Sequence, residues 1–505
     1  MSLYRIGRTS LDLKIVGAGL YASPLPPAEH PSLNEKERRD LEAFEAAGWS
    51  FLAAPDLDWS FLPYLKGGRR PTAGLLARHP SGGLVVLRNR LVLQFEPWVE
   101  ASTIARRLQA FSLVREVDMD ERVFEVELSL PRRGFEQHIL DEVDSLLEEG
   151  EVVCAEPSLL YHVERVPWGD PLDGPYGKWH WDQIKLANAW ALGGEGGKGE
   201  GSLVAVIDVG FHPEDRQIKP NVEWTVTLDQ DGNVVKGKFM PKDSHGTMCA
   251  GLVGAVLDRS EVNGAAPCSK LGLVALGDFR VCSQVALGIA LRMSAGLSSW
   301  SDCASIDRPA DVVSCSLGLT SSNWELSPYL RMAIDCVLSK GRSGRGTPIV
   351  WASFDANQRI ESWAVEGYYP LLVVSRSDYR DCRVASGWGE SLDLLAPGHA
   401  VTGIVWKGND RFIEPDSGSS LAAPCVAGVA ALVLSVNPTL SASEVAEVIT
   451  RSCEPVGSDP IPNKQVGWGR LNAERAVCMA LAMRNRVEGV TANPAAEGTP
   501  LRRPE

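Results

Sequence analysis

Residues 203–210, LVAVIDVG, form an unbroken apolar run that ends in Asp208 and Gly210. Such a run is typical of a strand buried on both faces, because a half-exposed strand alternates apolar and polar residues. Helical segments lie between several further apolar runs, at 270–278, 310–318, 347–353, 370–378 and 392–398. This alternation predicts an α/β domain with a mainly parallel sheet covered by helices on both faces. In such sheets, functional groups gather beyond the carboxyl ends of the strands.

Composition limits the class of protein. A chain of 505 residues is too long for one ordinary core and predicts two or three domains. The net charge of -14 argues against a nucleic-acid or acidic-lipid surface, so we expect no nucleic-acid partner. The 11 cysteines include no C-x-x-C pair and the N-terminus has no basic leader, which together predict reduced thiols and a cytoplasmic protein. We also expect no run of about 18 uncharged apolar residues, and hence no membrane contact.

The chain divides into four predicted parts. Residues 1–85 are uneven in composition and indicate no function. Residues 86–165 have the order strand, helix, strand, strand, helix, strand, which predicts a ferredoxin-like α+β domain. The larger α/β domain is predicted over 166–485, and a disordered tail over 486–505.

Three polar residues at the ends of predicted elements are candidates for chemistry. Asp208 closes a strand, His245 opens a helix, and Ser420, with Ser419 as second choice, starts a helix in DSGSSLAAPCVAG (416–428). Each also fits an ordinary role in a turn or helix cap. A serine at the positive end of a helix is, however, placed to act as a nucleophile. The order is Asp, His, Ser, with spacings of 37 and 175 residues.

Three segments in this order, AVIDVG, HGTMCAG and GSSLAAPCVAG, resemble the signatures of the subtilisin-like serine proteases, the subtilase family. The resemblance covers about residues 170–485 and includes NGAAPCSKL, LDLLAPG and VGWGRLNAERAV. It implies a serine endopeptidase acting on a protein or peptide substrate through a triad of Asp208, His245 and Ser420. It also implies a set of substrate-binding residues: Ser316, Leu317, Gly318 and Phe354.

One segment departs from the family pattern. The family places an Ala-Gly-Asn segment after a strand, and its Asn donates a hydrogen bond to the oxyanion. Here VWASFDAN places Phe354 at the glycine and Asp355 at the asparagine, unless a local shift brings in Asn357 instead. An ionised Asp cannot donate, and loss of such a donor costs about 10²–10³ in rate. A protonated Asp355 could still donate, and Phe354 could restrict the substrate pocket.

The domain at 86–165 resembles the inhibitory propeptide that precedes many subtilase domains. This implies a zymogen whose own N-terminal domain acts as an intramolecular inhibitor and is cut away between about residues 160 and 170. We assign no cofactor, although structural calcium is compatible with the family. Two alternatives stay open: a catalytically weak or inactive subtilase that binds a peptide or partner, and a narrow-specificity processing protease.

Overall fold

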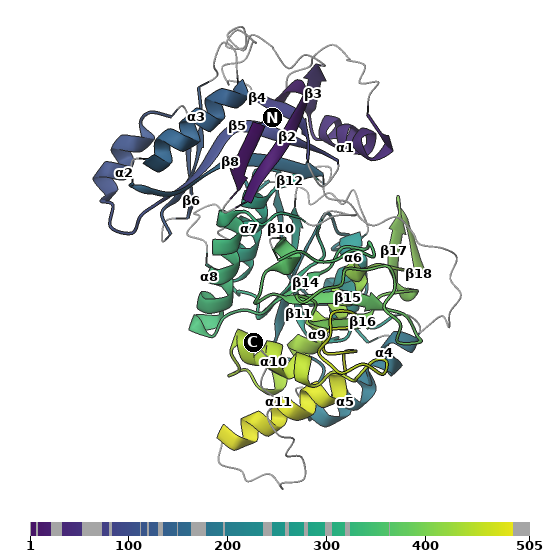
Figure 1. Cartoon of the computed structure of the whole chain (residues 1–505). Coiled ribbons are helices and arrows are strands. Elements are labelled where there is room, and N and C mark those ends of the chain that lie inside the picture. Colours follow the sequence, from purple (N-terminus) through teal and green to yellow (C-terminus); the bar gives the residue numbers. More distant parts are fainter. Residues whose placement is uncertain are drawn as a thin grey trace.

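The computed structural model describes the greater part of the chain in two packed parts (Figure 1). The described residues are 2–6, 9–21, 33–52, 73–79, 83–111, 113–118, 121–129, 135–148, 150–162, 178–194, 197–235, 245–257, 262–276, 281–297, 306–318, 324–362 and 364–487. An antiparallel sheet with its helices forms the N-terminal part, and a larger α/β unit forms the rest.

A seven-stranded parallel sheet lies at the centre of the larger part, which confirms the predicted fold class. Its order is β10 (Val222–Leu228), β11 (Lys270–Leu276), β9 (Leu203–Asp208), β13 (Val312–Cys315), β14 (Ile349–Ala352), β15 (Leu372–Ser377) and β16 (Leu394–Pro397). Along β9, Leu203, Ala205 and Ile207 join one core while Val204 and Val206 join the other. Both faces are therefore covered, which explains why the strand is apolar throughout.

Helices cover both faces of this sheet. One core cluster takes residues from α4 (Trp179–Gln183), α5 (Leu186–Gly193), α6 (His245–Gly254), α9 (Ser419–Val436), α10 (Ala442–Arg451) and α11 (Ala473–Val487). The other face carries α7 (Gln284–Ser294) and α8 (Pro328–Gly344), whose core continues into the N-terminal part. A two-stranded hairpin, β17 (Val401–Lys407) and β18 (Asp410–Asp416), precedes α9.

Helix α9 corrects one expectation. It is an 18-residue run with a mean hydropathy of 2.0, so it meets the length and composition of a membrane span. We expected no such run. In this structure 89% of the run is buried inside the protein, between the sheet and neighbouring helices, as in the core helix of a globular domain.

The N-terminal part is built on one antiparallel sheet. The strands β5 (Leu84–Phe95), β6 (Leu113–Asp118), β7 (Val123–Glu127) and β8 (Val152–His162) pair in the order β6-β7-β5-β8. With α2 (Ala101–Leu108) and α3 (Phe135–Glu148) as connections, this is the ferredoxin-like arrangement.

Residues before 85 extend the same sheet. The strands β1 (Ser2–Ile6), β2 (Thr9–Tyr21), β3 (Trp49–Leu52) and β4 (Ala73–Arg78) add to it, and helix α1 (Glu35–Ala46) contacts β3, β5 and β8. Strand β4 pairs with the first half of β5. The sheet thus runs without a break across the boundary predicted at residue 85.

A strand of the α/β part completes the N-terminal sheet. β12 (Val281–Ser283), directly before α7, pairs antiparallel with the end of β8, and Val281 lies opposite His162. A buried ion pair also joins the two parts, with Arg292 Nη1 2.6 Å from Asp118 Oδ2. Backbone pairing and buried charge therefore fix the N-terminal sheet on the outer face of α7 and α8.

Candidate active site

The structure brings Asp208, His245 and Ser420 into one hydrogen-bonded chain. His245 Nε2 lies 2.8 Å from Ser420 Oγ, and His245 Nδ1 lies 2.9 and 3.0 Å from the two Asp208 oxygens. Asp208 ends β9, His245 starts α6, and Ser420 is the second residue of α9. The three elements meet at the carboxyl end of the parallel sheet, where such folds place functional groups.

A glycine allows the histidine helix to approach the strand end. A Cβ atom at Gly246 would lie 2.3 Å from the Gly210 carbonyl oxygen and 2.9 Å from Asp208 Cβ. Both distances are below van der Waals contact, so a side chain there would push α6 away from β9. The small residue beside His245 thus sets the distance between the acid and the imidazole.

Burial and charge act in opposite directions on His245. Asp208 is fully buried and accepts a hydrogen bond from the Val209 N–H at 2.8 Å. Burial lowers the pKa of His245, but the Asp208 carboxylate outweighs it and holds that pKa well above its usual value. The carboxylate therefore orients the ring and stabilises an imidazolium.

A proline shapes the first turn of α9. Pro424 has no N–H, so the Ser420 carbonyl four residues earlier loses its ordinary helical partner. Two side chains replace that partner: Ser316 Oγ donates to the Ser420 oxygen at 2.9 Å, and Cys249 Sγ lies 3.3 Å from the same oxygen. The backbone of Ser420 is thus held from two other places, the residue directly after β13 and helix α6.

The Asp355 side chain lies beside the serine helix. Its Oδ1 accepts hydrogen bonds from the Ser419 N–H at 2.7 Å and from Ser419 Oγ at 2.8 Å. A Cβ at Gly418 would lie 2.6 Å from Ser420 Oγ and 3.4 Å from Asp355 Oδ2, so both oxygens border the same glycine. Asp355 therefore contacts the helix start that carries Ser420.

A buried arginine faces Asp355. Arg376 Nε lies 3.6 Å from Asp355 Oδ1 and donates to the Val384 carbonyl at 2.9 Å. Burial raises the pKa of Asp355, while Arg376 and the bonds from Ser419 act in the opposite direction, and the net pKa is raised. The carboxyl is therefore easier to protonate than an exposed aspartate.

The other predicted site residues take different places. Asn357 Oδ1 accepts a hydrogen bond from Arg383 at 3.0 Å, so its carbonyl end is engaged away from the triad. Leu317 and Phe354 are 3% exposed and belong to the core cluster. Gly318 is half-buried at the end of the Ser316 segment. The structure brings Asp355 to the serine, and it does not bring Asn357 there.

Sequence reasoning missed Cys249 and Arg376. Cys249 lies one helical turn after His245, and an (i, i+4) spacing places two side chains on one helix face. Arg376 is the one charged residue in the buried strand LVVSRS. A charge inside an otherwise uncharged buried strand was a signal for a buried partner, although the sequence does not say which carboxylate it meets.

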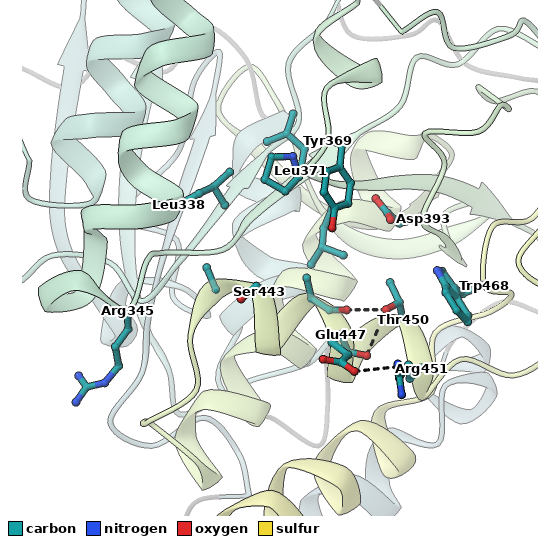
Figure 2. Close-up of a pocket in the computed structure, with 14 residues that line it drawn as sticks. Leu338, Arg345, Tyr369, Leu371, Asp393, Ser443, Glu447, Thr450, Arg451 and Trp468 are labelled. Atoms are coloured by element: carbon teal, nitrogen blue, oxygen red, sulfur yellow. Dashed lines mark hydrogen bonds and ion pairs between the residues drawn. The ribbon is translucent and has the colours of Figure 1, made fainter. Parts of the chain in front are cut away.

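A cavity of about 460 Å³ lies elsewhere in the fold (Figure 2). Leu338 of α8, Leu372 at the start of β15, and Ala442 and Glu447 of α10 line it. Figure 2 shows Glu447 paired with Arg451, whose Nε lies 3.0 Å from the carboxylate. Because β15 begins here, the cavity lies at the opposite end of the parallel sheet from the triad.

One cluster in the described part of the chain has metal-ligand spacing. Asp208, His245 and Cys249 present ligand atoms within 4.8 Å of one another. Calcium takes oxygen ligands, whereas this cluster offers an imidazole and a thiol as well as a carboxylate, so it does not fit calcium. We assign it no ion.

Proteins with the names of proteases have sequences similar to this chain. The calcium-dependent protease of Trichormus variabilis is 27% identical over 403 residues, or 68% of this chain and 56% of that protein. Thermitase of Thermoactinomyces vulgaris is 27% identical over 301 residues, covering 58% of this chain and 94% of its own length. This chain therefore spans little more than half the length of the calcium-dependent protease.

A solved structure and a family model extend the comparison. A structure described as proteases from Pseudoalteromonas arctica PAMC 21717 covers 61% of this chain and 99% of its own, at 24% identity and a TM-score of 0.51, and supports the fold. Residues 199–469 match the model of the subtilase family. That segment is more than half of the chain and contains Asp208, His245 and Ser420, and the protein belongs to the subtilase family.

Proposed function

We propose that this protein is a serine endopeptidase that hydrolyses protein or peptide substrates through Ser420. The observation that carries the proposal is the 2.8 Å contact between Ser420 Oγ and His245 Nε2. His245 takes the hydroxyl proton as Ser420 attacks the peptide carbonyl, and then gives it to the leaving amine. Asp208 holds the tautomer that leaves Nε2 free to accept and stabilises the imidazolium. Water then hydrolyses the acyl-enzyme by the same proton transfers.

The oxyanion is held by the start of α9 and by Asp355. The Ser420 N–H at the positive end of the helix is one donor. The second is Asp355 when its carboxyl is protonated, a form that burial makes easier to reach than in an exposed aspartate. Ser419 donates to Oδ1, leaving Oδ2 as the oxygen that carries the proton.

The N-terminal part is proposed to act as an intramolecular inhibitor of a precursor. Support comes from β8, whose end adds to β12 of the α/β part by backbone pairing up to His162. Extended peptides bind protein sheets in the same way. The predicted cleavage region at 160–170 begins within the end of β8, and its residues 163–170 lie outside the described residues.

A peptide-binding subtilase without activity is the second candidate, and Asp355 is the observation that favours it. Ionised, this side chain offers no donor and repels the oxyanion. A narrow processing role, a cytoplasmic location and the absence of nucleic-acid and membrane partners stay predictions from sequence. Calcium dependence is named for two relatives, and for this chain we propose no calcium ligands.

Casein hydrolysis by the purified protein tests the proposed activity. We expect Ser420→Ala to abolish hydrolysis, since loss of such a nucleophile costs about 10⁶ in kcat. Ser419→Ala is the matched control, because it removes the neighbouring hydroxyl and should retain measurable activity. Hydrolysis by Ser420→Ala, or none by the wild type after its N-terminal part has been removed, would contradict the proposal.

A further inference from the structure

Glu366 is a fully buried acidic residue close to the candidate active site. It lies in a short 3-10 turn, Val365–Gly367, and its exposed fraction is 0%. Among the described residues, no side-chain donor and no cation contacts either carboxylate oxygen. The backbone N–H groups of Glu366 itself and of Trp324 are the groups that favour its charge. A buried carboxyl without a counter-ion is costly and needs an explanation.

The position of this carboxylate suggests the explanation. A Cβ atom at Gly318 would lie 3.3 Å from Glu366 Oε1. Because Gly318 has no side chain, the carboxylate lies close to the backbone of Gly318. Two residues earlier, Ser316 Oγ donates to the Ser420 carbonyl at 2.9 Å. Ser316, which contacts the backbone of Ser420, and Gly318, which borders Glu366, are therefore two residues apart in the segment directly after β13.

The turn is fixed firmly in this place. The Val365 N–H donates to the Trp324 carbonyl at 2.6 Å, and Ala364 forms an isolated bridge with Glu325. A Cβ at Gly367 would lie 2.0 Å from the Glu361 carbonyl oxygen, so the chain is tightly folded on the far side of Glu366. These contacts fix the backbone of the turn, and the Glu366 carboxylate extends from it to the position beside Gly318.

We propose that Glu366 is the acidic base of the pocket for P1, the residue before the cleaved bond, and that it selects lysine or arginine there. The inference rests on the proposed function, because it needs a substrate bound along Ser316–Gly318. A P1 cation passing Gly318 would supply the counter-ion that Glu366 lacks, in a charge-assisted hydrogen bond. A neutral P1 residue would leave the carboxylate buried and unpaired, and a site of this kind rejects such a substrate strongly.

The electrostatics of the site agree with this role. Burial raises the pKa of Glu366 to about 7, against its ordinary value of 4.5. The shift reflects the cost of ionising this group without a partner. A bound guanidinium or ammonium would remove that cost.

A preference for arginine or lysine at P1 also predicts which peptide bond of this chain is cut during self-cleavage. From residue 160 to residue 170, Arg165 is the one arginine or lysine. It lies outside the described residues, three positions after His162, the last residue of β8. If Glu366 selects a basic P1 residue, self-cleavage should fall between Arg165 and Val166.

The test compares substrates that differ at P1 alone. Blocked tetrapeptide anilides ending in Arg, Lys, Gln or Leu are given to wild type, Glu366→Gln and the control Glu361→Gln. We expect wild type and the control to favour Arg and Lys over Gln by at least about 100-fold in kcat/KM, and Glu366→Gln to lose that ratio. The melting temperature of Glu366→Gln, compared with that of the wild type, shows whether this variant is folded. The inference is overturned if the wild type cleaves the Arg, Lys and Gln substrates with similar kcat/KM, or if Glu366→Gln keeps the wild-type preference for Arg and Lys. In either case, hydrolysis of the substrates would still support the proposed function.

A binding measurement decides the matter if no substrate is cut. The fluorescent cation p-aminobenzamidine is titrated into the full chain carrying Ser420→Ala and Arg165→Ala, so that the chain's own arginine cannot compete. Binding that is lost when Glu366→Gln is added supports the basic P1 pocket even without catalysis. Absence of binding, or equal binding with and without Glu366→Gln, overturns it.

Discussion

The side chain at position 355 decides how a negatively charged oxygen would be held beside Ser420. An asparagine would keep the Oδ1 contacts with Ser419 and present an N–H₂ group where Asp355 presents Oδ2. The aspartate can donate there only when protonated. Arg376 and His245 both favour its ionised form, and burial opposes them.

Asp355→Asn is therefore expected to raise kcat/KM, by up to about 10²–10³-fold. The gain should grow as pH rises, because the native carboxyl loses its proton with increasing pH and the amide does not titrate. Initial rates from pH 5 to 9 measure it. Asn357→Ala is the control, with little effect expected because Asn357 contacts Arg383. A large loss in the control, together with no change in Asp355→Asn, would make Asn357 the donor.

The pH profile also reports on His245. Its imidazole must be neutral to accept the serine proton, and Asp208 holds its pKa well above 6.5 despite burial. The rate should therefore fall as pH decreases through a value above 6.5, and Asp208→Asn should move this limb to lower pH and reduce the rate. An acid limb below pH 6 in the wild type would show that burial, and not Asp208, dominates the pKa of His245.

At the scale of elements, the sequence predicted the strands that are buried on both faces, but it did not predict which strands pair at the edge of a sheet. The run that becomes β9 is apolar because helices cover both sides. β12 has three residues, and its partner lies more than a hundred residues away on β8, so no local pattern marks it. The choice between Asp355 and Asn357 likewise needed a contact with Ser419 that crosses 64 residues of chain. Nonlocal pairing is what the sequence alone does not show.

The approach of α6 to β9 gives a prediction at this scale. Gly246→Ala would place a methyl group 2.3 Å from the Gly210 oxygen and move His245 away from Asp208. Activity should fall by about 10²-fold or more, because a displacement of about 1 Å in a catalytic group can cost that much. Gly251→Ala, on the same helix, meets only the flexible end of Ile404 at 3.0 Å and should be mild. Equal activity of the two variants would argue against the close-approach role of Gly246.

At the scale of the whole molecule, the joint between the two parts contains an unusual acid. Glu156 of β8 is buried at the start of α8, where its Oε1 lies 3.4 Å from the Tyr329 nitrogen. Burial raises its pKa to about 8 from an ordinary 4.5, since the neighbouring Tyr329 and Ser327 donors only partly offset desolvation. The docked chain thus keeps a proton that the unfolded chain loses.

This raised pKa makes stability depend on pH in a defined direction. Between about pH 4.5 and 8 the folded chain binds more protons at Glu156 than the unfolded chain, so stability falls as pH rises. Glu156→Gln does not titrate, so its stability relative to the parent should increase over this window, by at most about 1.4 kcal/mol per pH unit. Urea unfolding of full-length Ser420→Ala, with and without Glu156→Gln, measures the difference. A difference that stays constant with pH would exclude Glu156 as a titrating contact.

The central claim is that Ser420 is an activated nucleophile, and covalent labelling tests it most directly. A fluorophosphonate probe is added to the purified chain, and the labelled peptide is mapped by mass spectrometry. We predict a single modified serine, Ser420, because its hydroxyl lies 2.8 Å from His245 Nε2, and no label in Ser420→Ala or His245→Ala. Label on another serine, or an unlabelled wild type after removal of the N-terminal part, would contradict the account.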